Sequence, residues 1–305
     1  MKIAFLYTTS ELTPWKENVN KKTLHFLQNN LHPGYSSEIV LFQGFNQKMV
    51  QKLKQFDLVY NLSYGFKNAD QVDVVLWLEA NTIKHTTSDS YGMKIAQDKA
   101  ILPYICGKYG LFTPKIISAA EELQNDAIYI AKPRTGACHR GIQIGNGSWF
   151  HEKEYIKRKD YIIQPYIYGR EFSVAVIPSL NNDTYETLPP VEISHEENSK
   201  IFIAGQQYGK TRRNFVPDIN LEQNNNLVND ALTLHYKMGL KGASRTDFRM
   251  DENGNVFVLD VNAMPNMDPK FSLMPAICKF HGITICDLLN RIIYTATKQI
   301  VENKK

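Results

Sequence analysis

The stretch Arg245-Thr-Asp-Phe-Arg-Met-Asp-Glu-Asn-Gly-Asn-Val-Phe-Val-Leu-Asp-Val-Asn262 decides the fold that we expect for this chain. Two runs of alternating polar and apolar residues flank Asn253-Gly254, and Asn-Gly in a two-residue loop is the strongest local signal for a β-hairpin. The register follows by counting outward from that loop. The expected cross-strand pairs are Glu252 with Asn255, Arg249 with Val258, Asp247 with Asp260, and Arg245 with Asn262.

Side chains alternate between the two faces of a strand, so this register sorts the hairpin into a polar and an apolar face. The polar face holds Arg245, Asp247, Asp260 and Asn262, and the other face holds Thr246, Phe248, Leu259 and Val261. Two opposed carboxylates destabilise a sheet unless a cation lies between them. Carboxylate and amide oxygens suit Mg²⁺, which keeps waters and binds substrate phosphates. The alternative is a solvent-exposed polar face on which Arg245 or Arg249 neutralises the acids.

Composition places the chain among globular proteins. Its 305 residues, 43% hydrophobic and 22% charged, are enough for about two domains or one large enzyme built of subdomains. The formal charge of +4 comes from interleaved acids and bases, so we expect no nucleic-acid partner. No apolar run reaches the roughly 20 residues that span a membrane. We expect a cytoplasmic protein with reduced thiols, because no C-x-x-C pair occurs among its four cysteines, Cys106, Cys138, Cys278 and Cys286.

Residues 1–90 alternate short apolar runs with helical patterns, which predicts a Rossmann-like parallel sheet with crossover helices. The expected strands are 3–7, 38–42 and 57–62, and the expected helices are near 17–30, 46–55 and 71–80. No G-x-G-x-x-G follows the first strand, so the residues that let a backbone approach a dinucleotide are absent.

Residues 91–180 have a different pattern, that of an α+β unit. A helix is expected over 90–109, followed by strands at 127–133, 141–145, 161–166 and 171–177. The basic loop 132–141 joins the first two strands and holds two glycines, so its backbone N–H groups could wrap phosphate oxygens beside Lys132. It is not a Walker A loop, because Ile142-Gln143 stands where Lys-Ser/Thr is required. A flexible hairpin loop is the alternative.

Residues 181–305 form the third region. We expect a strand at 191–194, a long loop over 195–220, a helix at 221–238, the hairpin and two terminal helices. Thr284 with Asp287 three residues later predicts a capping box at the last helix.

Six short blocks, in this order, resemble the ATP-grasp superfamily and within it the D-alanine–D-alanine ligase family. They are Asp98-Lys99, Lys132-Pro133, Gly169-Arg170-Glu171, Ala243-Ser-Arg-Thr-Asp-Phe-Arg249, Leu259-Asp-Val-Asn262 and Ser272-Leu-Met-Pro275. The resemblance is strongest over residues 97–293. It implies an ATP-grasp fold of mixed α/β and α+β type: a pre-ATP-grasp domain (1–90), a central subdomain (91–180) and a C-terminal subdomain with the metal site (181–305).

The resemblance also implies roles in binding ATP. Lys99 and Lys132 match lysines that hold phosphates, and Glu171 matches the acid that binds the ribose. Cys138 and His139 replace serines of the phosphate loop. The expected adenine hinge comprises Gln164, Pro165, Tyr166 and Ile167. Solvated surface lysines and a surface glutamate remain the alternatives.

Further roles follow for catalysis. Asp247, Asp260 and Asn262 match the ligands of one or two Mg²⁺ ions, for which Mn²⁺ could substitute. Arg245 matches the arginine that stabilises a tetrahedral intermediate. Tyr208 resembles the tyrosine of a mobile lid, although it could equally anchor a loop.

Ser272, with Leu273, matches the site for the carboxylate of the second substrate. A serine at this position could instead be an ordinary helix N-cap.

Departures from the family pattern cluster at the first-substrate site. Tyr64 stands where a histidine is expected, and the substrate-orienting glutamate has loose candidates in Glu11 and Glu17, of which Glu17 has the better spacing. Asp260 is one methylene shorter than the usual glutamate, and Asn266 replaces a glycine. ATP use is therefore expected to be kept and first-substrate specificity to be altered.

The expected function is ATP-dependent ligation of two amino acids through an acyl phosphate. Two alternatives stay open: a genuine D-alanine–D-alanine ligase of cell-wall synthesis, and a homologue that binds Mg-ATP without ligating. The expected partners are small amino-acid substrates and a second copy of the chain in a homodimer, with no nucleic acid and no membrane.

Overall fold

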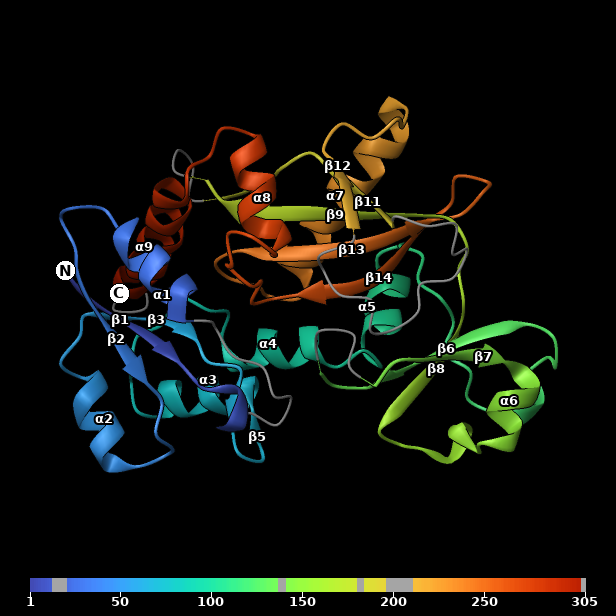
Figure 1. Cartoon of the computed structure of the whole chain (residues 1–305), viewed down its shortest axis with the longest axis horizontal. Helices are drawn as coiled ribbons and strands as arrows, with labels where there is room; N and C mark the ends of the chain where they lie inside the picture. Colours follow the sequence, from blue (N-terminus) through green and yellow to red (C-terminus); the bar gives the residue numbers. More distant parts are fainter. Residues whose placement is uncertain (13–20, 137–140, 180–183, 196–210, 303–305) are drawn as a thin grey trace.

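The computed structural model describes residues 1–12, 21–136, 141–179, 184–195 and 211–302 (Figure 1). Four of the predicted site residues, Glu17, Cys138, His139 and Tyr208, lie outside these ranges. No helix within the described ranges is long and apolar enough to cross a membrane.

The N-terminal unit is the expected parallel sheet, in the order β2-β1-β3. Its strands are β1 (Lys2–Tyr7), β2 (Ser36–Leu41) and β3 (Leu58–Leu62), and its helices are α1 (Lys21–Asn29), α2 (Gln47–Leu53) and α3 (Gln71–Ala80). Every residue of β3 is buried, as expected for a strand covered on both faces. A small hairpin, β4 (Gly65–Phe66) with β5 (Ala69–Asp70), leads into α3.

The helix expected over 90–109 is broken into α4 (Ser90–Gln97) and α5 (Leu102–Lys108). Asp98 leaves the helical conformation at the end of α4, and its carboxylate accepts a hydrogen bond from the Ala100 backbone N–H at 3.0 Å. Pro103 then opens α5, where its missing N–H costs nothing. The break turns the chain toward the unit that follows.

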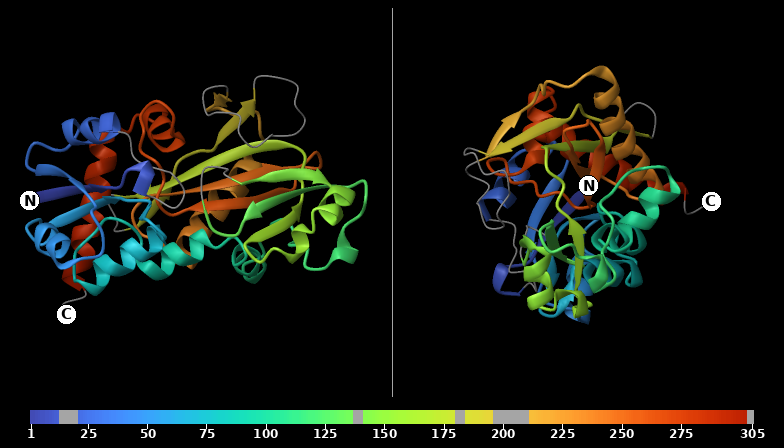
Figure 2. Two further views of the ribbon diagram at one scale, coloured as in Figure 1. Left: turned by 60° about the horizontal axis from the view of Figure 1, so that its bottom comes forward. Right: turned by 90° about the vertical axis from the view of Figure 1, so that its right-hand side faces the viewer.

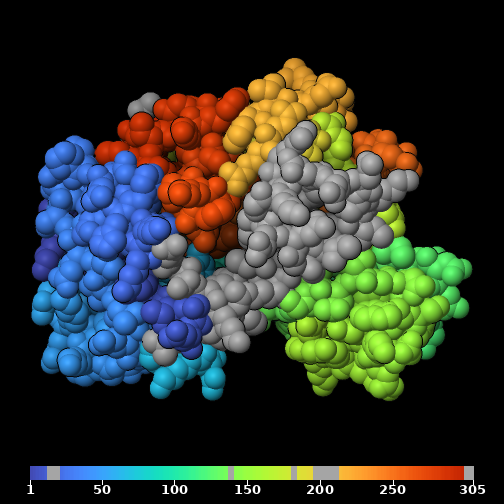
Figure 3. Space-filling view, viewed as in Figure 1, coloured from blue at the N-terminus to red at the C-terminus, as the bar shows by residue number. Residues whose placement is uncertain are grey.

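The central unit is a three-stranded antiparallel sheet in the order β7-β6-β8. It comprises β6 (Ile128–Pro133), β7 (Gln143–Asn146), β8 (Tyr161–Pro165) and the short helix α6 (Gly147–Glu152). Rings of Trp149, Phe150 and Tyr155 pack together over it. Figure 3 shows this unit, in green, at the opposite end of the molecule from the blue N-terminal unit.

The C-terminal unit is a larger antiparallel sheet in the order β12-β11-β9-β13-β14, with β10 also paired to β9. Its strands are β9 (Arg170–Pro178), β10 (Tyr185–Thr187), β11 (Val191–His195), β12 (Thr211–Asn214), β13 (Ser244–Met250) and β14 (Val256–Asn262). The strand expected at 171–177 in the middle region therefore belongs to this sheet, because its partners are β11 and β13. The long loop expected at 195–220 was wrong for 211–214, which pair with β11.

Helices α7 (Leu221–Lys237), α8 (Leu273–Phe280) and α9 (Ile285–Glu302) all contact β9. The predicted capping box at α9 is confirmed, since the Asp287 backbone N–H donates to the Thr284 hydroxyl and the Thr284 N–H donates to the Asp287 carboxylate. Helix α9 also packs against α1, so the two ends of the chain lie in the same part of the molecule (Figures 1 and 2).

The hairpin register is confirmed where it matters and wrong near its loop. Arg245 pairs with Asn262 and Asp247 with Asp260, as expected. Arg249, however, pairs with Phe257 instead of Val258. The connection spans residues 251–255, where the Asp251 carboxylate accepts from the N–H groups of Asn253 and Asn255. A bulge farther along the strands restores the offset, so the two deviations cancel before the acids are reached.

Because of that bulge, the prediction for the side chain of Leu259 was wrong. An extra residue in one strand re-aims its side chain. Leu259 was expected beside Phe248 and Val261 on the apolar face, yet it lines the same cavity as Asp260. Val261 of the predicted apolar face also lines the cavity, so the expected division into a polar and an apolar face does not hold at Leu259 or Val261.

Candidate functional site

A cavity of about 250 Å³ lies between the three units, and most of the described candidate residues line it. Those residues are Tyr64, Lys99, Lys132, Tyr166, Glu171, Arg245, Asp247, Asp260, Asn262, Asn266, Ser272 and Leu273. Gln164, Pro165 and Ile167 are described but do not line it. Sequence blocks far apart in the chain thus meet at one place.

The two opposed acids of the hairpin, Asp247 and Asp260, differ in their hydrogen bonding. Asp247 accepts hydrogen bonds from Arg245 Nε and Nη2 at 2.8 and 2.7 Å, and from the Ser173 hydroxyl at 2.5 Å. Asp260, its cross-strand partner, forms no hydrogen bond or ion pair with any other described residue. Arg245 does neutralise one acid, as the alternative interpretation held, but the pair is only 15% and 18% exposed, so the face is not an exposed one.

These residues can accept a hard cation. The described ranges contain no group of three or more His, Cys, Asp or Glu side chains able to hold a metal. Two opposed carboxylates and the nearby Asn262 amide are a smaller oxygen set, which suits an ion that keeps waters and takes further ligands from a phosphate. The free carboxylate of Asp260 is the observation that favours this fit, because an uncompensated acid at a cavity is costly.

Lys132 brings a buried cation to the same cavity. Its side chain is 8% exposed, and within the described ranges it forms no ion pair. Burial lowers the pKa of Lys132 to about 8, although the negative charge of Asp260 opposes the shift. A buried amine without a partner is costly, so an anion in the cavity would stabilise it.

Lys99 and the residues that follow β6 are held together by hydrogen bonds. The Lys99 amine donates to the Gly136 carbonyl at 2.8 Å, and its backbone N–H donates to the Arg134 carbonyl at 3.0 Å. Arg134 in turn donates to both oxygens of Asp98 at 2.8 and 2.7 Å. Burial opposes the shift, but these bonds lower the pKa of Asp98. Residues 98–99, which follow α4, are thus bonded to Arg134 and Gly136, which follow β6.

Glu171 forms an ion pair with Arg249. Arg249 was considered as a neutraliser of the metal-face acids, yet its Nη2 donates to Glu171 at 2.8 Å. Strands β9 and β13 place the two residues opposite each other. Arg249 Nη1 also donates to the Tyr166 hydroxyl and to the Ile167 carbonyl, at 3.2 and 3.1 Å. Arg249 therefore organises the expected ribose and adenine positions.

The expected adenine hinge is only partly at the cavity. Gln164 is buried and its amide donates to the Pro114 carbonyl at 2.8 Å, which occupies the side chain in a structural contact. Pro165 pairs with Tyr129 in the central sheet. A role of these residues in reading adenine stays a prediction.

Ser272 occupies the N-cap position of α8 without capping it, since its side chain accepts no hydrogen bond from the helix. The ordinary N-cap interpretation therefore does not explain this serine. It is 7% exposed and lines the cavity next to Leu273. Asn266 also lines it, and its side chain accepts from the Asp268 backbone N–H at 2.8 Å.

Several lining residues were missed by sequence reasoning. They include Gln71, Met93, Gln97, Leu259 and Phe271. Gln97 directly precedes the Asp98-Lys99 block, so its neighbourhood was a signal that we could have used. Nothing local marks Leu259, because the bulge that re-aims it depends on the sheet.

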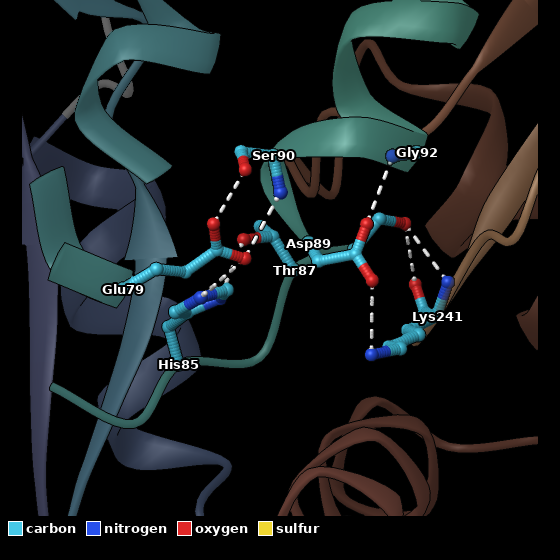
Figure 4. Close-up of polar contacts among 8 residues, drawn as sticks. Glu79, His85, Thr87, Asp89, Ser90, Gly92 and Lys241 are labelled. Carbon is cyan, nitrogen blue, oxygen red and sulfur yellow. Dashed lines mark hydrogen bonds and ion pairs between the residues drawn. The ribbon is translucent and has the colours of Figure 1, made fainter. Parts of the chain in front are cut away.

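Helix α4 carries several of these residues and is fixed at its N-terminal end by a joint between two units (Figure 4). Glu79 of α3 accepts from the Ser90 N–H and hydroxyl at 3.0 and 2.5 Å. Asp89 caps the helix by accepting from the Gly92 N–H at 2.9 Å, and its other oxygen lies 3.1 Å from the amine of Lys241. A Cβ on Gly92 would lie 2.9 Å from the Gly239 carbonyl, so only glycine allows this approach.

Comparisons with known proteins agree with this architecture. Residues 151–294 match the family model described as the D-ala D-ala ligase C-terminus. The chain is 26% identical over 262 residues to D-alanine–D-alanine ligase of Fusobacterium nucleatum, covering 86% of this chain and 88% of that protein. It is 29% identical over 257 residues to the enzyme of the same name from Brucella anthropi, covering 79% and 81%.

Solved structures share the fold. D-alanine–D-alanine ligase from Bacillus anthracis, complexed with ATP, superposes with a TM-score of 0.78 at 22% identity over 99% of both chains. VanG D-Ala:D-Ser ligase from Enterococcus faecalis gives a TM-score of 0.76 at 16% identity, covering 97% of this chain and 99% of that one. The expected ATP-grasp architecture with its N-terminal parallel sheet is confirmed.

Proposed function

We propose that this chain, which belongs to the D-alanine–D-alanine ligase family and is an ATP-dependent ligase, forms a peptide bond between two amino acids through an acyl phosphate. One observation carries the proposal: a buried Lys132 and an acidic Asp260, neither of which forms an ion pair with another described residue, line one cavity with Arg245 and Ser272. Unpaired charges of both signs in a shared cavity suit a substrate that brings both a phosphate and a cation.

The nucleotide has supporting residues on two units. Lys132 and Lys99 would supply positive charge for its phosphates, beside Gly136 of the basic loop. Glu171 would accept hydrogen bonds from the ribose hydroxyls, held in place by Arg249. Tyr166 offers a ring at the same end of the cavity.

Asp247, Asp260 and Asn262 would hold Mg²⁺, or Mn²⁺ in its place. When bound, the ion neutralises charge on the nucleotide phosphates. Arg245 keeps Asp247 charge-compensated in the metal-free chain through two hydrogen bonds. One or two ions could be accommodated, and Asp260 is shorter than the glutamate that would bridge two.

The reaction follows from this arrangement. A carboxylate oxygen of the first amino acid attacks the γ-phosphorus, the bond to the bridging oxygen breaks, and ADP leaves with that electron pair. The neutral amine of the second amino acid then attacks the acyl carbon to form a tetrahedral intermediate, the C–O bond to the phosphate breaks, and the nitrogen loses a proton to solvent as phosphate leaves. Arg245 would stabilise the negative charge that develops on the oxygen of this intermediate. The roles expected for Glu17 and Tyr208 stay predictions.

The substrates are proposed from further residues that line the cavity. Ser272 and Leu273 would take the carboxylate of the second amino acid. Tyr64 lines the cavity where the family places a histidine, so we propose a first amino acid other than D-alanine. D-alanine stays the alternative first substrate, because the relatives from Fusobacterium nucleatum and Brucella anthropi are named D-alanine–D-alanine ligases.

We also propose a homodimer, on the family resemblance alone, and a cytoplasmic location, from the pattern of cysteines and the lack of a long apolar run. Analytical ultracentrifugation tests the oligomer, and a single species at the monomer mass of 35.0 kDa would contradict it.

Phosphate release from Mg-ATP tests the ligase. We expect ADP and phosphate only when an amino acid is present, in a scan of single and paired L- and D-amino acids. Mass spectrometry of the product then identifies the pair, and D-Ala-D-Ala as the best product would favour the genuine D-alanine–D-alanine ligase. Tight Mg-ATP binding without turnover across the whole scan would sink the proposal in favour of a nucleotide-binding homologue. Chelation of the metal by EDTA should abolish release.

A further inference from the structure

The loop that leads into Ser272 is organised by one side chain, that of Asp268. Its Oδ1 accepts from the backbone N–H groups of Lys270 and Phe271 at 2.9 and 3.0 Å, and its backbone carbonyl accepts from the Ser272 N–H at 3.0 Å. A single residue therefore receives three successive N–H groups of the chain that ends at Ser272. Such a turn forms locally and sets the shape of the loop.

Orientation of this loop comes from a distant part of the chain. The second oxygen of Asp268 accepts from the Thr23 hydroxyl at 2.7 Å, and Thr23 is 2% exposed. Thr23 lies in α1 of the N-terminal unit, so this bond joins the first helix to the loop after the hairpin. A hydrogen bond to a carboxylate is about twice as strong as a neutral one, and this one is partly buried.

The loop is also held on its other side. Arg213 of β12 donates to the Phe271 carbonyl at 2.6 Å, and the ring of Phe215 stacks on Phe280 of α8 with centroids 4.7 Å apart. Those contacts come from the C-terminal unit itself. Thr23 is the contact, among the described hydrogen bonds of Asp268, that fixes the loop relative to the N-terminal unit.

We propose that Thr23 and Asp268 are positioning residues for the second amino acid. Together they set where Ser272 stands in the cavity, and through α1 they link its placement to the half of the site that is expected to hold the first amino acid. This inference rests on the proposed function, because it takes Ser272 as the contact for the second carboxylate. Neither residue touches substrate.

A matched pair of variants tests the link. Thr23→Val removes the hydroxyl at almost constant size, whereas Thr23→Ser keeps the hydroxyl and loses a methyl group. Hydrogen–deuterium exchange on the substrate-free chain should show several-fold faster exchange over residues 268–273 in Thr23→Val, with Thr23→Ser close to the wild type. Exchange over α7 should not change. Equal exchange in all three proteins would overturn the proposal.

Kinetics tests the consequence for substrate. With the amino-acid pair found in the scan, Thr23→Val should raise KM for the second amino acid about tenfold, as expected for a lost charge-assisted hydrogen bond. KM for ATP and kcat at saturation should stay within about twofold, and Thr23→Ser should restore KM. A change in kcat alone, or in every KM equally, would contradict positioning of the second substrate.

The two proposals fail in different ways. If the wild-type chain releases no phosphate with any amino acid, the ligase assignment fails and the substrate part of this inference falls with it. If the wild type turns over and Thr23→Val has wild-type constants, only the positioning role fails.

Discussion

Two clusters of charged residues in this chain differ in how completely their charges are compensated. At the joint on the N-terminal end of α4, Glu79 and Asp89 receive hydrogen bonds from backbone and side chains, and Lys241 pairs with Asp89 (Figure 4). At the cavity face, Asp260 and Lys132 have no such partner within the described ranges. Sequence alone presents both clusters as scattered acids and bases.

The difference separates structure from function. A buried charge is costly unless hydrogen bonds or an opposite charge compensate it. At the joint, the charged side chains fix the N-terminal end of α4 between two units. In the cavity, Lys132 and Asp260 form no ion pair with any described residue, and burial lowers the pKa of Lys132 although the charge of Asp260 opposes the shift. Such a charge lowers the stability of the folded chain until a ligand of opposite charge binds.

The largest effect is expected at the metal face. Asp247→Ala removes a carboxylate from the proposed cation site, so turnover should fall at least about 10³-fold while the fold persists. Circular dichroism and phosphate release measure the two outcomes. Undiminished activity in this variant would mean that the hairpin is only scaffold, and the contrast between the clusters would collapse.

Lys132→Met should have opposite effects on turnover and on stability. Loss of the phosphate-binding charge should lower kcat/KM for ATP about 10²-fold. The free energy of unfolding should rise by about 2 kcal/mol at pH 7, because an uncompensated buried amine is removed. Denaturant melts with and without Mg-ATP check this. A variant that loses both activity and stability would show that Lys132 is paired in the folded chain.

The pH dependence sharpens the same prediction. The folded pKa of Lys132, about 8, lies below its ordinary value of 10.5. The unfolded chain therefore binds more protons between these values, and this group makes stability rise with pH across that window. In the free enzyme, kcat/KM for ATP should fall about tenfold between pH 7 and pH 9 as the charge is lost. Lys132→Arg should remove that fall, since arginine stays charged.

The smallest effect on turnover is expected at the joint. Asp89→Ala removes the cap of α4 and the partner of Lys241, which should lower the free energy of unfolding by about 1 kcal/mol. Phosphate release should stay within about threefold of the wild type, because neither residue lines the cavity. A loss of activity as large as that of Asp247→Ala would show that this joint does more than position a helix.

Local patterns predicted many of the elements that the structure contains, but not β4, β5, α6, β10 or β12. The parallel N-terminal sheet, the antiparallel hairpin and the facing of Asp247 with Asp260 all follow from periodicity and a turn signal. The register error at the hairpin loop had a local cause, the turn built on Asp251, whereas another error fell where the backbone responds to a distant residue. The helix over 90–109 broke at Asp98, whose partner Arg134 lies in another unit.

The sequence by itself determined which residues are chemically able to form the site: the acids of the hairpin, Lys132, Glu171 and Ser272. Tertiary structure decided which of them pair with one another and which have no partner among the described residues. Arg249 meets Glu171 only because β9 lies beside β13, and Thr23 meets Asp268 across 245 positions of chain. Alternation along a strand is a local property of the backbone, whereas the partner of a charge depends on which strands and helices pack together.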